Sequence, residues 1–386
     1  LFFFCCFHVT TVRKKRKKKN KERKKKKKGE GKKYRSWNKL YSPGRTGAKK
    51  MENIPTYDAL PPVDGMPAGC AWGVFDKPGE PKDVYGTLNH LTPEVVAAAG
   101  AEVRDGVSIS LNWPLTALNH IPIPGRRKTV HHVRTLVEQG MVKEGATGLD
   151  DELEFNTQSS SQWDSFVHWA HQPTGASYNG FKATPDNVVA SSAAPTVDKW
   201  HARGGVVARG VLVDFKRWAD ANAKAYHPFD AYRITVEDLE EVAAAQGVEF
   251  KPGDVLLVRT GVTEVWEAPS EEDFAKIMRR TISGLHAVEE TVRWLWDRRF
   301  AAVVCDNNAV EALPPLNEDG DVGEMEDLFL HSHCLGLLGM PLGELWDLNK
   351  LSDHCAKTGR YSFLLTSAPL NAAGLVGSPP NALAIF

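Results

Sequence analysis

Basic residues are concentrated at one end of this chain, and this asymmetry constrains which residues can fold. Residues 1–50 contain 21 of the 48 Lys and Arg residues but only two acids, Glu22 and Glu30, and so carry a charge of +19. Residues 51–386 carry −19, from 27 basic and 46 acidic side chains. A run of like charge buries too little apolar surface to offset the entropy of the chain. We therefore expect the folded domain to span residues 51–386.

The first 50 residues resemble neither a membrane span nor a secretory signal. The opening LFFFCCF is too short to cross a bilayer, and the charges follow it instead of preceding it. The first methionine is Met51. We interpret residues 1–50 as a basic extension, disordered or non-native, that the domain does not need. A nucleic-acid-binding arm is the alternative; we expect neither a nucleic-acid nor a membrane partner.

Local patterns predict one α/β domain with a mixed central β-sheet. Capping signals start helices at Thr92 and Thr235, and LHAVEETVRWLWDRR predicts a third helix over 285–299. These helices interleave with strands without strict βαβ regularity. Nucleotide-binding glycine motifs are absent from the sequence. Strands are predicted in the β-branched runs that begin at 107, 206, 254, 301 and 361.

The cysteines predict a reducing, cytoplasmic environment. Six are present, and no CxxC pair occurs among them. Neither a thiolate zinc site nor a disulfide framework is therefore indicated.

The densest polar cluster is QSSSQWDSFVHWAHQ, which begins at Gln158. Gln158, Gln162, Asp164 and His168 are spaced so that an extended segment would direct several of them into one cleft. Carboxylate, amide and imidazole groups can hold a divalent ion, and a free histidine can move protons near neutral pH. From spacing alone we favour the simpler interpretation, a polar loop in which Asp164 caps a helix.

A second cluster, LHSHCLGLLGMPLGELWDL, contains His331, His333 and Glu344. By itself it is typical of a helix with surface histidines, followed by a turn at Gly339 to Pro341. A metal site assembled by folding also requires two remote clusters of this kind.

Together the two clusters resemble the signature of the cyclase family that includes bacterial kynurenine formamidase and isatin hydrolase. The family motif HxGTHxDxPxH is similar to the segment from Gln158 to His168, and its distal His and Glu match His331 and Glu344. The blocks that begin at Cys70, 253 and 301, and the C-terminal TSAPLNAAGLVGSPPNALAIF, resemble the family as well. The resemblance implies an α/β cyclase-family fold of the swivelling β/β/α type. It also implies a homodimer or homotetramer.

The resemblance implies a metal-dependent hydrolase of an amide or cyclic amide, with N-formylkynurenine or a similar aryl amide as substrate. By this resemblance Asp164, Glu344, His331, Gln162 and Gln158 hold the metal. The QWD form, followed by YNG at 178–180, is similar to a branch in which Gln replaces the metal-binding His. Amides bind borderline metals less tightly than imidazoles do, and an oxygen-rich site favours Mn²⁺ or Mg²⁺ over Zn²⁺. By the resemblance the expected cofactor is a divalent metal, Mn or Zn, and the two amides imply that it is weakly bound or lost.

By the same resemblance His168 is the general base. Trp163 and Trp169 are candidates to line an aromatic-substrate pocket, although large aromatics are more often core. Arg259 and Asp306, each at a strand end, either touch substrate or anchor loops, whereas the histidines at 131 and 132 indicate a surface patch. The two amides leave open a metal-poor relative that binds a small molecule or partner without turnover.

Overall fold

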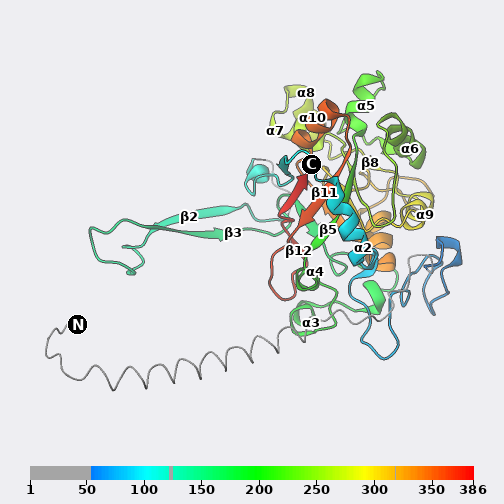
Figure 1. The fold of residues 1–386 in the computed structure, drawn as a ribbon, viewed down its shortest axis with the longest axis horizontal. Coiled ribbons are helices and arrows are strands. Elements are labelled where there is room, and N and C mark those ends of the chain that lie inside the picture. The colour runs from blue at the N-terminus through cyan, green and yellow to red at the C-terminus, as the bar shows by residue number, and fades with distance from the viewer. Residues whose placement is uncertain (1–53, 121–124, 318) are drawn as a thin grey trace, which may run out of the picture. The chain divides into compact units, whose positions relative to one another are not determined.

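The computed structural model describes residues 54–120, 125–317 and 319–386. The predictions for residues 1–50, both the dispensable extension and the nucleic-acid-binding arm, lie outside these residues. Within them, the predicted α/β architecture with a mixed central sheet is confirmed (Figure 1).

A curled sheet of nine strands runs through the described residues in the order β1-β13-β11-β5-β7-β9-β10-β4-β12. The neighbours β5, β7, β9 and β10 are parallel, and the remaining pairs are antiparallel. The five predicted strands are all present, because each β-branched run is long enough to specify a strand locally. The strands are β1 (Ser108–Ser110), β4 (Gln162–Asp164), β5 (Val206–Val213), β7 (Val255–Val258), β9 (Ala302–Cys305), β10 (Leu342–Glu344), β11 (Ser362–Ser367), β12 (Gly377–Ser378) and β13 (Ala382–Ile385).

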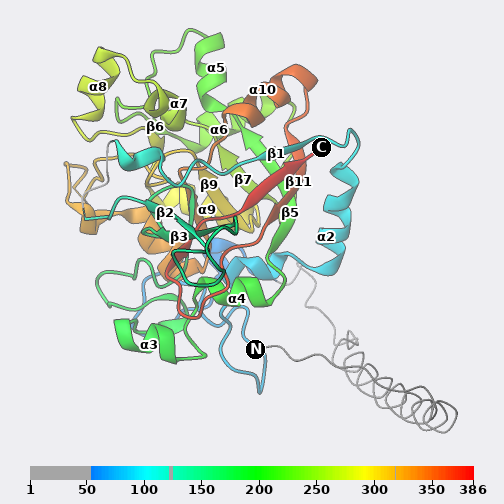
Figure 2. The same ribbon diagram turned by 90° about the vertical axis from the view of Figure 1, so that its left-hand side faces the viewer.

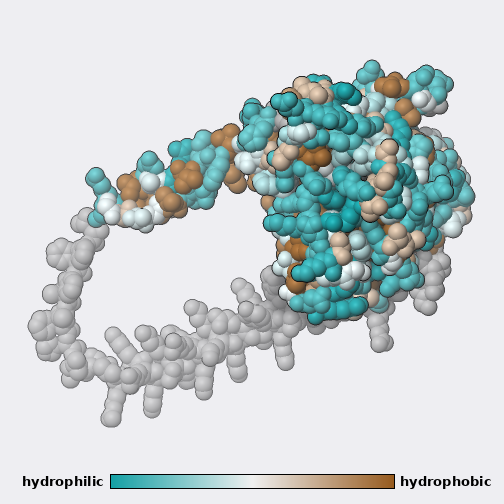
Figure 3. Space-filling view, turned by 90° about the horizontal axis from the view of Figure 1, so that it is seen from above, coloured by the Kyte–Doolittle hydropathy of each residue, from teal (hydrophilic) through white to brown (hydrophobic). Residues whose placement is uncertain are grey.

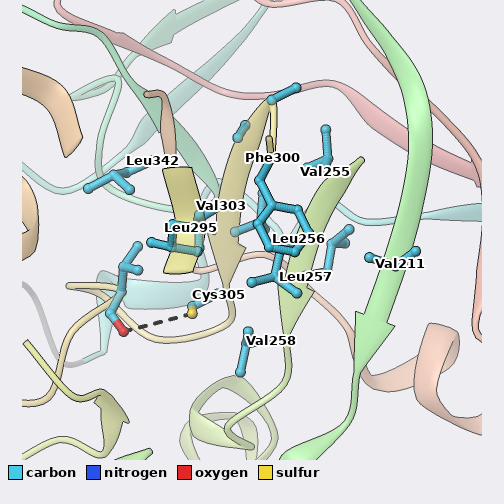
Figure 4. Close-up of a cluster of buried hydrophobic side chains, with 14 of the residues drawn as sticks. Val211, Val255, Leu256, Leu257, Val258, Leu295, Phe300, Val303, Cys305 and Leu342 are labelled. Atoms are coloured by element: carbon cyan, nitrogen blue, oxygen red, sulfur yellow. Dashed lines mark hydrogen bonds between the residues drawn. The ribbon is translucent and has the colours of Figure 1, made fainter. Parts of the chain in front are cut away.

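The parallel centre of the sheet is buried on both faces. All side chains of β7 and β9 are buried, as expected for strands that read as continuous apolar runs. Leu295 of α9 and Phe300 lie among the strand side chains in Figure 4. This packing makes the central strands a rigid frame for the residues at their ends.

Capping chemistry starts the predicted helices where expected. Thr92 accepts a hydrogen bond from Val95 at the start of α2, and Thr235 forms a capping box with Asp238 at the start of α6. In Figure 2, α2 lies beside β5 and β11. The helices are α2 (Pro93–Ala99), α3 (Pro185–Ala190), α4 (Val197–Ala202), α5 (Phe215–Ala221), α6 (Val236–Ala245), α7 (Val262–Glu267), α8 (Glu271–Ile277), α9 (Glu289–Asp297), α10 (Asn349–Thr358) and the π-helix η8 (His331–Leu338).

The helix predicted over 285–299 begins later than expected, at Glu289. Leu285 belongs instead to β8 (Gly284–Leu285), which pairs with β6 (Arg233–Ile234) in parallel. The N–H of His286 donates to the carbonyl of Ile234, so the backbone before α9 is already engaged in non-helical bonds. Pairing between distant segments therefore overrides the local helical pattern.

A two-stranded hairpin, β2 (Val130–Thr135) and β3 (Leu149–Glu154), projects from the rest of the domain (Figure 1). Every one of its strand residues is exposed. Figure 3 shows apolar patches along it. Its exposed large apolar side chains include Val133, Leu149 and Leu153. The expected surface patch at His131 and His132 lies on this hairpin, where His131 pairs with Asp151.

No helix in the described ranges is both long enough and apolar enough to cross a membrane.

Candidate metal and catalytic site

The pairing of β4 with β10 brings the two sequence clusters together. The strands are antiparallel, with Gln162 opposite Glu344 and Asp164 opposite Leu342. Because side chains alternate along a strand, Gln162 and Asp164 point to the same face of the sheet, and Glu344 joins them there. The Gln162 amide donates to Glu344 Oε2 over 2.7 Å. Gln162 and Glu344, 182 positions apart in the sequence, thus share one buried site.

His331 enters this site from the first turn of η8. Its Nε2 lies 3.1 Å from Glu344 Oε1, and its Nδ1 lies 2.9 Å from Glu311 Oε1. Burial lowers the pKa of His331, but the hydrogen bonds and charges of Glu311 and Glu344 outweigh it and raise that pKa to about 10. The expected surface histidine is therefore a buried one, only 3% exposed, held between two carboxylates.

Asp164 is fully buried and has one free oxygen. Its Oδ1 accepts hydrogen bonds from the amides of Gln158, over 2.6 Å, and Gln162, over 3.4 Å. Its Oδ2 has no hydrogen-bond partner among the described residues. Burial raises the pKa of Asp164; Glu344 raises it too, whereas His168 and His331 lower it. A buried carboxylate oxygen without a donor is an acceptor site for a proton or a cation.

His168 lies one turn beyond Asp164 and is half-buried. Its backbone N–H donates to the carbonyl of Ser165, and the intervening Phe166 is buried against Tyr178 and Trp200, which anchors the turn. The Gln158 amide nitrogen lies 3.0 Å from His168 Nδ1. His168 is therefore fixed beside Asp164 while keeping access to solvent.

Asp164, His168 and His331 could hold a metal ion. One ligand atom from each lies within 4.8 Å of the others. The free Oδ2 of Asp164 adds an unsatisfied anionic ligand. One carboxylate and two imidazoles match the ligand chemistry of divalent transition metals. The residues present therefore fit such an ion.

The two glutamines contact the carboxylates through their amide nitrogens. Gln158 donates to Asp164, and Gln162 donates to Asp164 and Glu344. Arg126 supports this orientation, because its Nη1 lies 3.4 Å from Gln162 Oε1 and also donates to the backbone carbonyl of Gln158. Rotating the Gln162 amide would place its oxygen against two carboxylates and its nitrogen against a guanidinium. The amide oxygens are thus turned away from Asp164 and Glu344.

The predicted substrate residues occupy different places. Trp163 is fully buried on the other side of β4; it packs against Trp200 and Trp346 and donates to Ser367, so its role here is packing. The ring of Trp169 lies beside the site, with its centroid 6.0 Å from that of His331.

Arg259 and Asp306 both anchor structure at strand ends. Arg259 is engaged by Asp214, Glu264 and Asn349. Asp306 accepts hydrogen bonds from the N–H groups at 260 and 261 and from a threonine hydroxyl. Within the described ranges neither side chain forms a hydrogen bond to a residue of the site.

Sequence reasoning missed two contributors, Glu311 and Arg126. Glu311 lies in the AAVVCDNNAVEA block, where an acid between apolar residues was the available signal for a buried carboxylate. Arg126 lies in a basic run before the hairpin, and nothing in the sequence distinguishes it from an ordinary surface arginine. Both reach the site only through tertiary folding.

The comparisons place this chain in a class of α/β proteins with a curled mixed sheet. The family described as "Putative cyclase" matches residues 80–312, and the chain belongs to that family. The crystal structure of a novel cyclase is 30% identical, with a TM-score of 0.65 over 79% of this chain and 96% of that one. Isatin hydrolase A from Labrenzia aggregata, bound to benzyl benzoate, is 16% identical, with a TM-score of 0.50 over 75% and 96%. The second likeness shows the fold alone. No curated protein matches.

Proposed function

We propose that this protein is a divalent-metal-dependent hydrolase of an amide or cyclic amide, with aryl amides such as N-formylkynurenine as the substrate class. The observation that most supports this function is the Oδ2 of buried Asp164, which has no hydrogen-bond partner among the described residues and lies beside two imidazoles. Membership of the cyclase family and the shared fold with an isatin hydrolase support this proposal.

In this proposal the two buried members of the group, Asp164 and His331, would hold the ion, and the half-buried His168 would be left for proton transfer. A bound divalent ion polarises a carbonyl and lowers the pKa of a water molecule. His168 accepts the proton of the attacking water and later donates it to the leaving amine. Glu344 Oε1 lies 3.1 Å from Nε2 of His331, so it is close enough to contribute a further oxygen ligand.

Two further side chains fit an aryl amide. Trp169 presents a large aromatic surface beside His168 and His331. Its Nε1 is buried and donates to none of the described residues. Arg126 is half-buried at the site and adds a cation that would favour a substrate bearing a carboxylate.

Metal content and arylformamide hydrolysis, measured on the same purified protein, test this function. We expect about one divalent ion per chain, with Mn²⁺ or Zn²⁺ restoring hydrolysis after chelation. Asp164→Asn should lose both ion and activity. The matched control is Asp151→Asn, a carboxylate on the exposed hairpin, which should retain both. A metal-loaded wild-type protein without activity on amides would rule out the proposed reaction.

The orientation of the glutamines favours one other function, a metal-poor relative that binds a small molecule without turnover. Amide nitrogens aimed at Asp164 and Glu344 satisfy these carboxylates without a cation. Under this alternative the wild-type protein contains no stoichiometric metal after dialysis against Mn²⁺, and aryl amides bind without being hydrolysed.

A further inference from the structure

Glu311 is a fully buried carboxylate whose two oxygens are both occupied by one short segment. Its Oε2 accepts the N–H groups of Phe329, over 2.9 Å, and Leu330, over 3.2 Å. Its Oε1 accepts the N–H of His331 over 2.9 Å. Three backbone donors at the start of η8 thus converge on a single side chain.

The same Oε1 also accepts the imidazole Nδ1–H of His331, over 2.9 Å. The backbone and the ring of this residue are therefore tied to one atom, which restricts rotation of the side chain. With Nδ1 engaged there, Nε2 is the ring atom that faces Glu344. A histidine that donates one ring N–H to a carboxylate presents its other nitrogen in a defined direction.

We propose that Glu311 is a positioning residue, which fixes the ring of His331 so that Nε2 points into the candidate site. Its consequence for metal affinity depends on the proposed function, whereas its effect on the imidazole does not. The competing explanation is that Glu311 only caps η8 and contributes to stability.

Asp306 provides the matched control for these two explanations. It is also fully buried and also clamps backbone N–H groups, those of Thr260 and Gly261, over 2.6 and 2.7 Å. Among the described residues its carboxylate bonds to Thr260 and Gly261 and not to Asp164, His168 or His331. Asp306→Asn should therefore weaken a buried set of hydrogen bonds to backbone N–H groups, as Glu311→Gln does, without altering the imidazole of His331.

The test follows the ring of His331 in full-length, metal-free protein by NMR with ¹⁵N-labelled histidine. We expect an exchange-protected Nδ1–H resonance, assigned by its loss in His331→Gln. Glu311→Gln should shift it or expose it to exchange, and Asp306→Asn should leave it in place. The proposal also predicts the protected Nδ1–H resonance in the wild-type protein. If this resonance is absent, the proposal is wrong, whether or not Glu311→Gln folds.

Mn²⁺ titration of the same proteins adds a second readout. Glu311→Gln should weaken Mn²⁺ binding roughly 10- to 100-fold, the usual effect of losing a partner that orients a ligand. Asp306→Asn should bind as the wild type does. Unchanged His331 resonances and unchanged Mn²⁺ binding in a destabilised Glu311→Gln protein would show that Glu311 is only a cap. Wild-type protein that binds no Mn²⁺ contradicts the proposed function, while the NMR result still decides the role of Glu311.

Discussion

Gln162 and Glu344 lie directly opposite each other on β4 and β10, and the amide of one donates a 2.7 Å hydrogen bond to the carboxylate of the other. The Gln162 amide is neutral. A carboxylate at the same position would repel the carboxylate of Glu344. Gln162 is also fully buried, so water cannot screen any charge introduced there.

Gln162→Glu should therefore make stability depend on divalent cations. In the presence of a chelator we expect the free energy of unfolding to fall by about 3 kcal/mol relative to the wild type, the effect of an uncompensated buried charge. Added Mn²⁺ should restore much of this free energy, because it binds the folded state only. Unfolding by urea with and without Mn²⁺ measures both values. Gln172→Glu, an exposed position in the loop after His168, should show neither effect, and cation-independent stability of Gln162→Glu would contradict the prediction.

His168→Ala should reduce arylformamide turnover by roughly a hundredfold or more, the usual contribution of positioned proton transfer. Because His168 is half-buried and its backbone turn is anchored by Phe166, the melting temperature should change little. His132→Ala on the exposed hairpin is the control and should retain full activity. Full activity in folded His168→Ala would remove the proposed base.

His90 should make the protein sensitive to acid. Its buried ring packs against Phe75 and Trp296, and burial together with the charge of Arg299 lowers its pKa from 6.5 to about 3. The unfolded chain binds the proton more readily, so stability falls as pH drops from about 6.5 towards 3.

The slope attributable to His90 should approach about 1.4 kcal/mol per pH unit within that window. His90→Leu should flatten the dependence of unfolding free energy on pH by this amount, because Leu cannot titrate. His132→Leu on the hairpin should leave the wild-type slope unchanged. Equal slopes for wild type and His90→Leu would mean that His90 accepts a proton in the folded state.

Gly343→Ala should disturb the site through packing. A Cβ at Gly343 would lie 2.8 Å from a methyl group of Val304 and 3.0 Å from Trp346 Nε1, both in the buried core. We expect destabilisation of about 1 to 3 kcal/mol, as for other overpacked cores, and reduced turnover because the adjacent Glu344 must move. Gly100→Ala, where the added Cβ meets nothing and φ is −58°, should fold at least as stably as the wild type. Calorimetry and the hydrolysis assay measure both effects.

The sequence predicted the elements whose signals are local. The apolar runs at β5, β7 and β9 and the capping residues Thr92 and Thr235 specify their elements within a few residues. The three-residue strands β4 and β10 have no such signal, because their conformation depends on pairing with each other. Leu285 shows the same limit, since a distant strand decides its conformation.

The sequence predicted those residues of the site that lie within a recognisable motif. Asp164, His168 and His331 were singled out by residue type and family resemblance, and folding brings their ligand atoms together. Spacing alone favours a polar loop around Asp164, and the sequence around His331 carries no signal that this side chain is buried. Glu311 accepts hydrogen bonds from three backbone N–H groups and from the imidazole of His331, and no side-chain pattern in the sequence encodes these contacts.

The pairing of β4 with β10 also determines when the site can exist during folding. The two strands are separated by 177 residues, 165–341, and β10 must lie between β9 and β4 in the sheet. Closing a loop of this length costs chain entropy before any contact repays it, so such pairings form late. A partly folded chain with only the parallel centre assembled would hold His331 and Asp164 apart. Hydrolytic activity in a refolding experiment would then report completion of the whole sheet, and it should recover after the burial of the tryptophans on α9.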